Sequence, residues 1–369
     1  MENTKQRSKF RSFLDKKGIT LSPKVYFVDA MSAMALGLFA SLLIGTIFGS
    51  VRDQLLPDSL AAGNVIYDFI NYMAQIGDVK ASGNAIGAVL GIAVAYSLKA
   101  TPLSMLSAGA VGMLGHQLGT TIGTSNVTAG PLGAFLCVLI AVEVTKLVAK
   151  ATKVDIIVTP AVMLVVGALM AMLLCPGIAY LMYWLGEFIK AATNALPFFM
   201  GIVIAVVVGI VLTLPISSAA LCAMISIGGI AGGAAAVGCC AQMVGFAVIS
   251  FRENKWGGVI AQGIGTSMLQ MGNIVKNPLI WIPATLASAI TGPISTCVFK
   301  LECTGVFAGM GTCGLVGPIG ILKDMNFSAT SIIGVLLLCI ILPAILSLIF
   351  SEIMRKLGWI KEGDMKLAL

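Results

Sequence analysis

The chain has 369 residues, of which 58% are hydrophobic and 11% are charged, and its mean hydropathy is +1.00. Soluble domains carry about 25% charged residues, so the composition excludes a soluble enzyme and predicts an all-α polytopic membrane protein. At about 20 residues for each transmembrane helix, the length allows roughly eight to ten spans. The 42 glycines and 19 methionines suit close helix contacts and adaptable packing.

The net charge of +7 reflects cations near the two ends and in one loop. No signal peptide with an apolar core and a small-residue cleavage site is recognisable at the start. By the positive-inside rule we expect both termini in the cytoplasm, in a bacterial inner membrane. The charge therefore follows topology and does not indicate nucleic-acid binding. The cations concerned are Lys5, Arg7, Lys9, Arg11, Lys16, Lys17 and Lys24; Lys146, Lys150 and Lys153; and Arg355, Lys356, Lys361 and Lys366.

Three regions are expected along the chain. Residues 1–24 form a cytoplasmic basic amphipathic helix on the lipid surface, because Phe10, Phe13 and Leu14 share one helical face opposite the cations. Residues 25–351 form the membrane transporter domain, and residues 352–369 form a cytoplasmic tail.

The apolar stretches predict the order of the membrane helices. Spans are expected at 27–50, 81–98, 131–148, 158–184, 196–214 and 331–350, with a short interfacial or periplasm-facing helix at 59–77. Stretches interrupted by glycine or proline lie at 99–130, 225–251, 257–275, 278–293 and 303–322. The first of these is compatible with a re-entrant hairpin or with a broken helix. Interrupted hydrophobic segments are the best sequence indication of a transporter's binding site.

Residues 191–251 contain no charged side chain, and residues 225–238 are mostly glycine and alanine. Such a stretch predicts helices that pack very closely or that are broken at membrane depth. Irregular backbone is tolerated in a bilayer only where it is buried in protein or lines a cavity. We therefore expect a binding cavity lined by 105–130, 225–245, 262–277 and 302–320.

Residues 307–320 form the sharpest local motif, with five glycines among small and polar residues. Glycine lets backbone groups approach a ligand directly, and proline frees a carbonyl within a helix. The motif is equally compatible with close helix packing of the Gly-x-x-x-Gly kind. Thr312 lies within it and is a candidate contact for a solute.

Polar side chains in apolar surroundings are the other candidate solute contacts. His116 is compatible with binding hydroxyls or with a structural histidine satisfied by a carbonyl. Glu302 is compatible with accepting hydroxyl hydrogen bonds or with pairing to Lys300, whereas Glu143 and Lys146 are expected to form an interfacial salt bridge. The remaining candidates carry amides, with two donors and two lone pairs each: Gln117, Asn126, Gln262, Gln270, Asn273 and Asn277.

No enzyme motif is recognisable in the sequence, and no cofactor is expected. The chain lacks a nucleotide-binding loop, a nucleophile elbow and paired Cys-x-x-Cys ligands, and His116 is its only histidine. Most of the nine cysteines lie within apolar runs, which indicates small buried side chains and no metal site.

Several of these features together resemble a known family. The basic helix at 8–17, Asp29 at the start of the first span and residues 43–48 near its end resemble the start of the sugar permeases of the phosphotransferase system, the membrane IIC subunits. The glycine motif at 308–317 and residues 276–283 resemble the IIC-like toxin-regulator (PfoR) group. The resemblance covers most of the chain.

The resemblance implies a homodimer in which each chain has a scaffold domain and a transport domain with two re-entrant hairpins. The transport domain would move as an elevator, and by residue type His116 and Glu302 would hold the sugar. Any phosphorylation would need separate cytoplasmic IIB and IIA proteins. We therefore expect a permease for a small polar solute, such as a sugar or sugar-like compound; the alternative is a membrane sensor that binds a solute without net transport.

Overall fold

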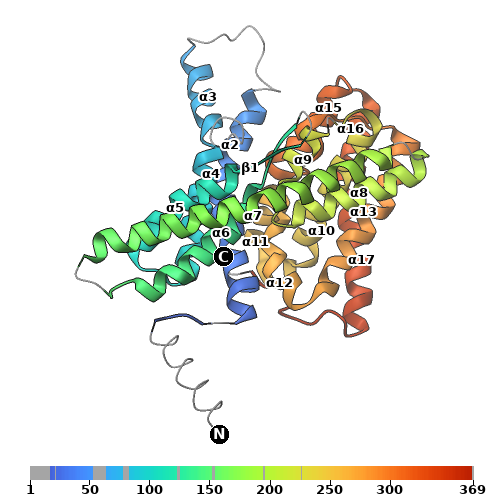
Figure 1. Cartoon of the computed structure of the whole chain (residues 1–369). Helices are drawn as coiled ribbons and strands as arrows, with labels where there is room; N and C mark the ends of the chain where they lie inside the picture. Colours follow the sequence, from blue (N-terminus) through green and yellow to red (C-terminus); the bar gives the residue numbers. More distant parts are fainter. Residues whose placement is uncertain are drawn as a thin grey trace. The chain divides into compact units, whose positions relative to one another are not determined.

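The computed structural model describes residues 17–20, 22–52, 64–77, 83–122, 125–151, 154–193, 196–225 and 227–367. In this part of the chain the regular elements are helices apart from one two-stranded sheet (Figure 1). The predicted all-α polytopic class is therefore confirmed. The amphipathic helix expected within residues 1–24 falls almost entirely outside the described residues.

Five described segments are long and apolar enough to cross a membrane, and three shorter apolar helices accompany them. Each uninterrupted span expected from the sequence overlaps one of these eight segments, although the span expected at 27–50 overlaps Val25–Gly37 only in its first half. The five are Gly130–Val148, Asp155–Ile189, Gly229–Ile249, Pro278–Phe299 and Ala329–Lys356; the three are Val25–Gly37, Ala85–Ser97 and Pro197–Thr213.

The chain divides into two compact units, and unit 1 consists of Met1–Leu38, Gly83–Thr120 and Thr128–Ala179. Its elements include the π-helix η1 (Val25–Asp29), the start of α2 (Ala30–Ser50), α4 (Gly83–Ser97), α5 (Pro102–Gln117), α6 (Gly130–Val148) and the first part of α7 (Asp155–Thr193). The span expected at 158–184 is thus a longer helix of 39 residues, which continues through Pro160 and Pro176.

Glycines bring α4, α5 and α6 into backbone contact. A Cβ atom added at Gly87 of α4 would lie 2.7 Å from the carbonyl oxygen of Gly112 on α5. A Cβ atom added at Gly115 of α5 would lie 2.9 Å from the carbonyl oxygen of Gly133 on α6. The interrupted stretch at 99–130 therefore forms one closely packed helix, α5, which is followed by the short strands β1 (Gly119–Ile122) and β2 (Ser125–Thr128).

The ion pair expected near the end of α6 is present in unit 1. Lys146 Nζ lies 3.0 Å from Glu143 Oε1 and also donates a hydrogen bond to the carbonyl oxygen of Gly18, at 3.2 Å. The Lys146 side chain is buried, so these contacts compensate part of the cost of removing its charge from water.

Unit 2 consists of Phe39–Ser82, Thr121–Val127 and Tyr180–Leu369. Its centre is formed by α8 (Pro197–Thr213), α10 (Gly229–Ile249), α13 (Ile282–Ile294) and α17 (Leu342–Lys356), and both α10 and α13 contact the other three (Figure 1). In the most apolar stretch of α10, 89% of the residues are buried. The glycine-alanine stretch therefore forms a close-packed helix from Gly229 onward, preceded by a break.

The other elements are short. They are α3 (Val65–Gly77), α9 (Ser218–Met224), α11 (Phe251–Ile260), η3 (Ala261–Gly265), η4 (Ser267–Gln270), α12 (Met271–Lys276), η5 (Pro278–Trp281), η6 (Ser295–Phe299), α14 (Gly305–Ala308), η7 (Cys313–Leu315), α15 (Val316–Asp324), α16 (Ala329–Gly334) and η8 (Val335–Ile341). Helix α3 corresponds to the short helix expected at 59–77, and Val65, Ile66, Phe69 and Tyr72 on it are exposed.

Candidate functional site

Unit 2 interrupts its helical backbone at three places beside α10. The interruptions are the described residues 225, 227 and 228 before α10, residues 261–271 from η3 into α12, and residues 301–315 between η6 and α15. Helix α10 contacts η3, η4, α14 and α15, and η3 also contacts η7. Three discontinuous segments therefore meet around one buried helix, which is the arrangement that transporters use to present backbone groups to a solute.

The first and last interruptions hydrogen-bond to each other through their main chains. The Cys303 N–H group donates to the Gly229 carbonyl oxygen at 3.2 Å, and the Gly305 N–H group donates to the Ile227 carbonyl oxygen at 2.8 Å. At Gly232, in the first turn of α10, any side chain would collide with the Cys303 carbonyl oxygen. The absence of a side chain there is what allows the extended chain to lie against the helix.

The glycine motif forms an irregular loop at residues 309–315, which we call the glycine loop. Ser218 Oγ donates to the Gly309 carbonyl oxygen at 2.7 Å, which fixes the loop to α9. Gly311 has a φ of +55°, and a Cβ atom there would lie 2.8 Å from the carbonyl carbon of Cys239 on α10. Glycine in the motif thus serves close packing and an irregular main chain together.

Thr312 is the unusual side chain of the glycine loop. It is 3% exposed, and its Oγ1 atom is buried without a hydrogen-bond partner among the described residues. Most buried polar atoms in proteins are hydrogen-bonded, and a buried unpaired hydroxyl costs about 1–3 kcal/mol. Thr312 is therefore the residue of the glycine loop whose side-chain hydroxyl has no partner among the described residues.

The second interruption places further polar groups beside α10. Thr266 is extended, with a φ of −160°, and its Oγ1 accepts a hydrogen bond from the Met268 N–H group at 3.2 Å. Ser267 Oγ and Thr213 Oγ1 of α8 are both buried and lie 2.8 Å apart. No sequence pattern marks this hydroxyl pair, because Ser and Thr are common in helices of this chain.

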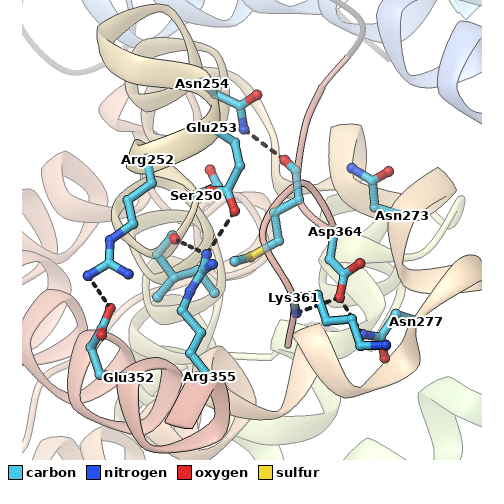
Figure 2. Close-up of polar contacts among 12 residues, drawn as sticks. Ser250, Arg252, Glu253, Asn254, Asn273, Asn277, Glu352, Arg355, Lys361 and Asp364 are labelled. Atoms are coloured by element: carbon cyan, nitrogen blue, oxygen red, sulfur yellow. Dashed lines mark hydrogen bonds and ion pairs between the residues drawn. The ribbon is translucent and has the colours of Figure 1, made fainter. Parts of the chain in front are cut away.

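Gln262, Gln270 and Asn273 are joined in series by side-chain hydrogen bonds, and Asn277 follows Asn273 by one turn and bonds to residues 359 and 364 instead. We call these four predicted amides the amide row. Gln270 Nε2 donates to Gln262 Oε1 at 2.9 Å, and Asn273 Nδ2 donates to Gln270 Oε1 at 2.8 Å. Gln262 Nε2 donates to Ser250 Oγ at 2.8 Å and to the Gly258 carbonyl oxygen. The remaining donors reach residues 359–366, beyond the end of α17. The bond from Asn277 to Asp364 is drawn in Figure 2.

Both N–H groups of each amide in the row are used within unit 2, and each amide oxygen accepts at least one hydrogen bond. The structure thus brings the four predicted residues together. Their role as solute contacts stays a prediction, and a solute would have to replace partners that the amides already have.

The other predicted residues are placed separately. In unit 1, His116 is buried at the end of α5 against Gly87, whereas Gln117 is exposed. In unit 2, Asn126 of β2 and Glu302 are exposed, and among the described residues Glu302 forms no ion pair with Lys300. The roles predicted for these four side chains stay predictions.

The chemistry of the three interruptions is polar and uncharged. Residues 225–229, 261–271 and 309–315 contain no Asp, Glu, Lys, Arg or His. They contain the unpaired Thr312 hydroxyl, the amides of Gln262 and Gln270, whose N–H groups are already bonded within unit 2, and main-chain groups. Among the described residues no group of three or more His, Cys, Asp or Glu side chains is placed to hold a metal ion.

Comparison with known proteins gives one match. The family model described as "Phosphotransferase system, EIIC" matches residues 28–367, which is nearly the whole chain. No curated protein and no solved structure matches it significantly. The match agrees with the apolar helices and with the interrupted segments around α10. The chain belongs to the EIIC family of the phosphotransferase system, the membrane permease components of that system.

Proposed function

We propose that this permease carries a small neutral polar solute, a sugar or sugar-like compound, and that the glycine loop of unit 2 holds it. The buried, unpaired Oγ1 atom of Thr312 is the observation that carries the proposal. A solute hydroxyl would supply the missing partner and remove the cost of the unpaired group. The uncharged surroundings support a neutral solute.

The amide row extends the proposed site from the glycine loop. Segment η3, which carries Gln262, contacts η7 at the end of the loop. A hydroxyl-rich solute could therefore be passed from the Thr312 hydroxyl to side-chain amides of the same unit. Glu302 of unit 2 remains a further proposed contact, and His116 remains a proposed solute contact within unit 1.

The proposed mechanism is alternating access of the elevator type, in which one domain moves with the bound solute. The division of the chain into two compact units supports this mechanism, because each unit has its own packed helices. Separate IIB and IIA proteins would phosphorylate the solute if it is taken up by group translocation. We further propose a homodimer in a bacterial inner membrane with both termini in the cytoplasm.

The test is uptake by proteoliposomes that contain only the purified chain. Radiolabelled hexoses, pentoses, hexitols and nucleobases are compared, each with the Thr312→Val variant and with Thr291→Val as the matched control. Thr291 is buried on α13, and its hydroxyl already donates to the Ala287 carbonyl oxygen. Uptake that is reduced only in Thr312→Val supports the proposal. Binding without uptake would favour the alternative function, a membrane solute sensor.

A further inference from the structure

The segment that follows α17 folds back onto the amide row. We call residues 359–367 the C-terminal strap (Figure 2). Helix α17 ends at Lys356, and Gly358 then adopts a φ of +75°, a left-handed conformation that glycine adopts without strain. The strap therefore begins at a sharp turn that is well suited to act as a hinge.

The strap is bound mainly through its main chain. Gln270 Nε2 donates to the Met365 carbonyl oxygen at 3.0 Å, and Asn273 Nδ2 donates to the Lys366 carbonyl oxygen at 2.9 Å. Asn254 of α11 contacts the strap twice: its Nδ2 donates to the Met365 carbonyl oxygen, and its Oδ1 accepts from the Leu367 N–H group, each at 2.8 Å. The amides thus contact the strap much as a neighbouring peptide would.

The other end of the strap is fixed by Asn277 and Asp364. Asn277 Nδ2 donates to the Trp359 carbonyl oxygen at 3.0 Å and to Asp364 Oδ2 at 2.8 Å (Figure 2). Asp364 Oδ2 also accepts from the Lys361 N–H group at 2.8 Å. The strap therefore accepts one hydrogen bond from each of the Gln270 and Asn273 amides and two from the Asn277 amide. No solute can use those donors while the strap is in place.

Helix α17, from which the strap extends, is attached to α11 by contacts that do not involve the strap. Arg355 of α17 pairs with Glu253 of α11 at 2.9 Å, and both side chains are almost completely buried. Arg355 also donates to the Ile249 carbonyl oxygen at 3.3 Å. This anchor precedes the turn at Gly358, so the contact between α17 and α11 through Arg355 and Glu253 does not depend on the strap (Figure 2).

Few apolar contacts oppose the release of the strap. Within it only Ile360 and Met365 are buried apolar side chains, with exposures of 2% and 0%. Lys361, Glu362, Gly363 and Lys366 are exposed. Segments with few buried apolar contacts open locally at a lower free energy than the core does. The strap has this character, whereas α10 is buried along nearly its whole length.

We propose that the C-terminal strap is a displaceable, autoinhibitory cover of the amide row. In place, its carbonyl groups occupy the amide donors; displaced at Gly358, it frees Gln270, Asn273 and Asn277 for the hydroxyl groups of a solute. The second part of this inference rests on the proposed function, whereas the displacement itself does not.

The first test is hydrogen–deuterium exchange of the full-length chain in nanodiscs, followed by mass spectrometry. The Lys361 amide reports on release, because its acceptor Asp364 is untouched in the Asn254→Ala variant. Loss of the two Asn254 hydrogen bonds should raise exchange across the strap about tenfold or more, while α10 stays protected. Arg252→Ala is the matched control on α11, because Arg252 forms an exposed ion pair with Glu352 and not with the strap. In this variant the strap should exchange at the same rate as in the unmodified chain.

The second test is uptake of the same panel of sugars, hexitols and nucleobases by these variants and by Asn273→Ala. We expect Asn254→Ala to raise the uptake rate, because only the cover is weakened. Asn273→Ala should speed exchange but lower uptake, because it removes both a contact of the strap and an amide of the row. If the strap has only a structural role, stability and uptake should change in the same direction in both the Asn254→Ala and the Asn273→Ala variant.

Three results distinguish failure of the strap proposal from failure of the proposed permease function. A strap that exchanges only together with α10 would overturn the proposal, whether or not the chain transports anything. Faster exchange with unchanged uptake in both Asn254→Ala and Asn273→Ala would also overturn it, while loss of uptake in Thr312→Val would still support the permease function. Absence of both binding and uptake in every variant would contradict the proposed function, and the exchange data alone would then decide whether the strap is displaceable.

Discussion

Replacement of Thr312 by valine separates binding from folding. Valine has nearly the same shape as threonine but lacks the hydroxyl group, which is buried without a partner among the described residues. An unpaired buried hydroxyl costs about 1–3 kcal/mol, so the variant should be more stable than the unmodified chain by up to that amount. In the Thr291→Val control the lost hydroxyl is bonded to its own helix, so stability should change by less than about 1 kcal/mol.

The same replacement should weaken solute binding. A neutral hydrogen bond contributes about 0.5–1.5 kcal/mol, which corresponds to an increase in Kd of about 2- to 13-fold. Thermal unfolding in detergent, with and without the transported compound, measures both effects on one sample. A variant that is less stable than the unmodified chain, yet binds and transports normally, would show that the Thr312 hydroxyl has a structural partner, and the reasoning would be refuted.

Two further predictions concern packing and charge, and thermal unfolding of the detergent-solubilised chain tests both. Gly91→Ala should destabilise unit 1 by about 1–3 kcal/mol, because the added methyl group would collide with the main chain of α5. Gly177→Ala should be neutral or slightly stabilising, because an added Cβ atom would meet no atom within 4 Å beyond the local backbone of its own helix. An equal effect of the two would contradict this packing. Glu253→Gln should cost about 3–5 kcal/mol, because the nearly buried Arg355 loses its ionic partner, whereas Arg252→Ala removes an exposed pair and should cost about 0–1 kcal/mol. Similar losses in both would show that the Glu253 pair is solvated.

The fold could be predicted from the sequence where a helix is uniformly apolar. The spans expected at 131–148 and 196–214 match α6 and α8 closely, because hydropathy and length alone determine such helices. The end of α7 was not predictable in the same way. Polar residues after 184 reduce the hydropathy without reducing helix propensity, so the helix continues to Thr193.

The β-hairpin that follows α5 was missed for a different reason. Its strands have four residues each, and residues 119–128 combine Gly, Thr, Ser and Asn, which are typical of loops. A pairing this short gives no periodic signal over a window long enough to separate a strand from a loop. The sequence could therefore indicate only that the helical pattern ends near residue 118.

The amide row could be predicted as a cluster but not as a saturated one. Asn273 and Asn277 lie one helical turn apart, which places them near each other in any helical structure. The groups that use their donors come from residues 359–366, about 90 positions further along the chain. A contact over that separation follows from how α17 packs against its neighbours, and local sequence patterns carry no information about it.

Glycine spacing distinguishes the two uses of this residue in the chain. In unit 1, Gly87 and Gly91 are four residues apart, so both lie on one face of α4 and meet the main chain of α5. In the glycine motif the spacings are two or three residues, at 309, 311, 314 and 317. Such intervals do not keep glycine on one helical face, and two of these positions adopt positive φ. Regular spacing of four thus indicates helix contact, whereas the irregular spacing marks the loop that holds Thr312.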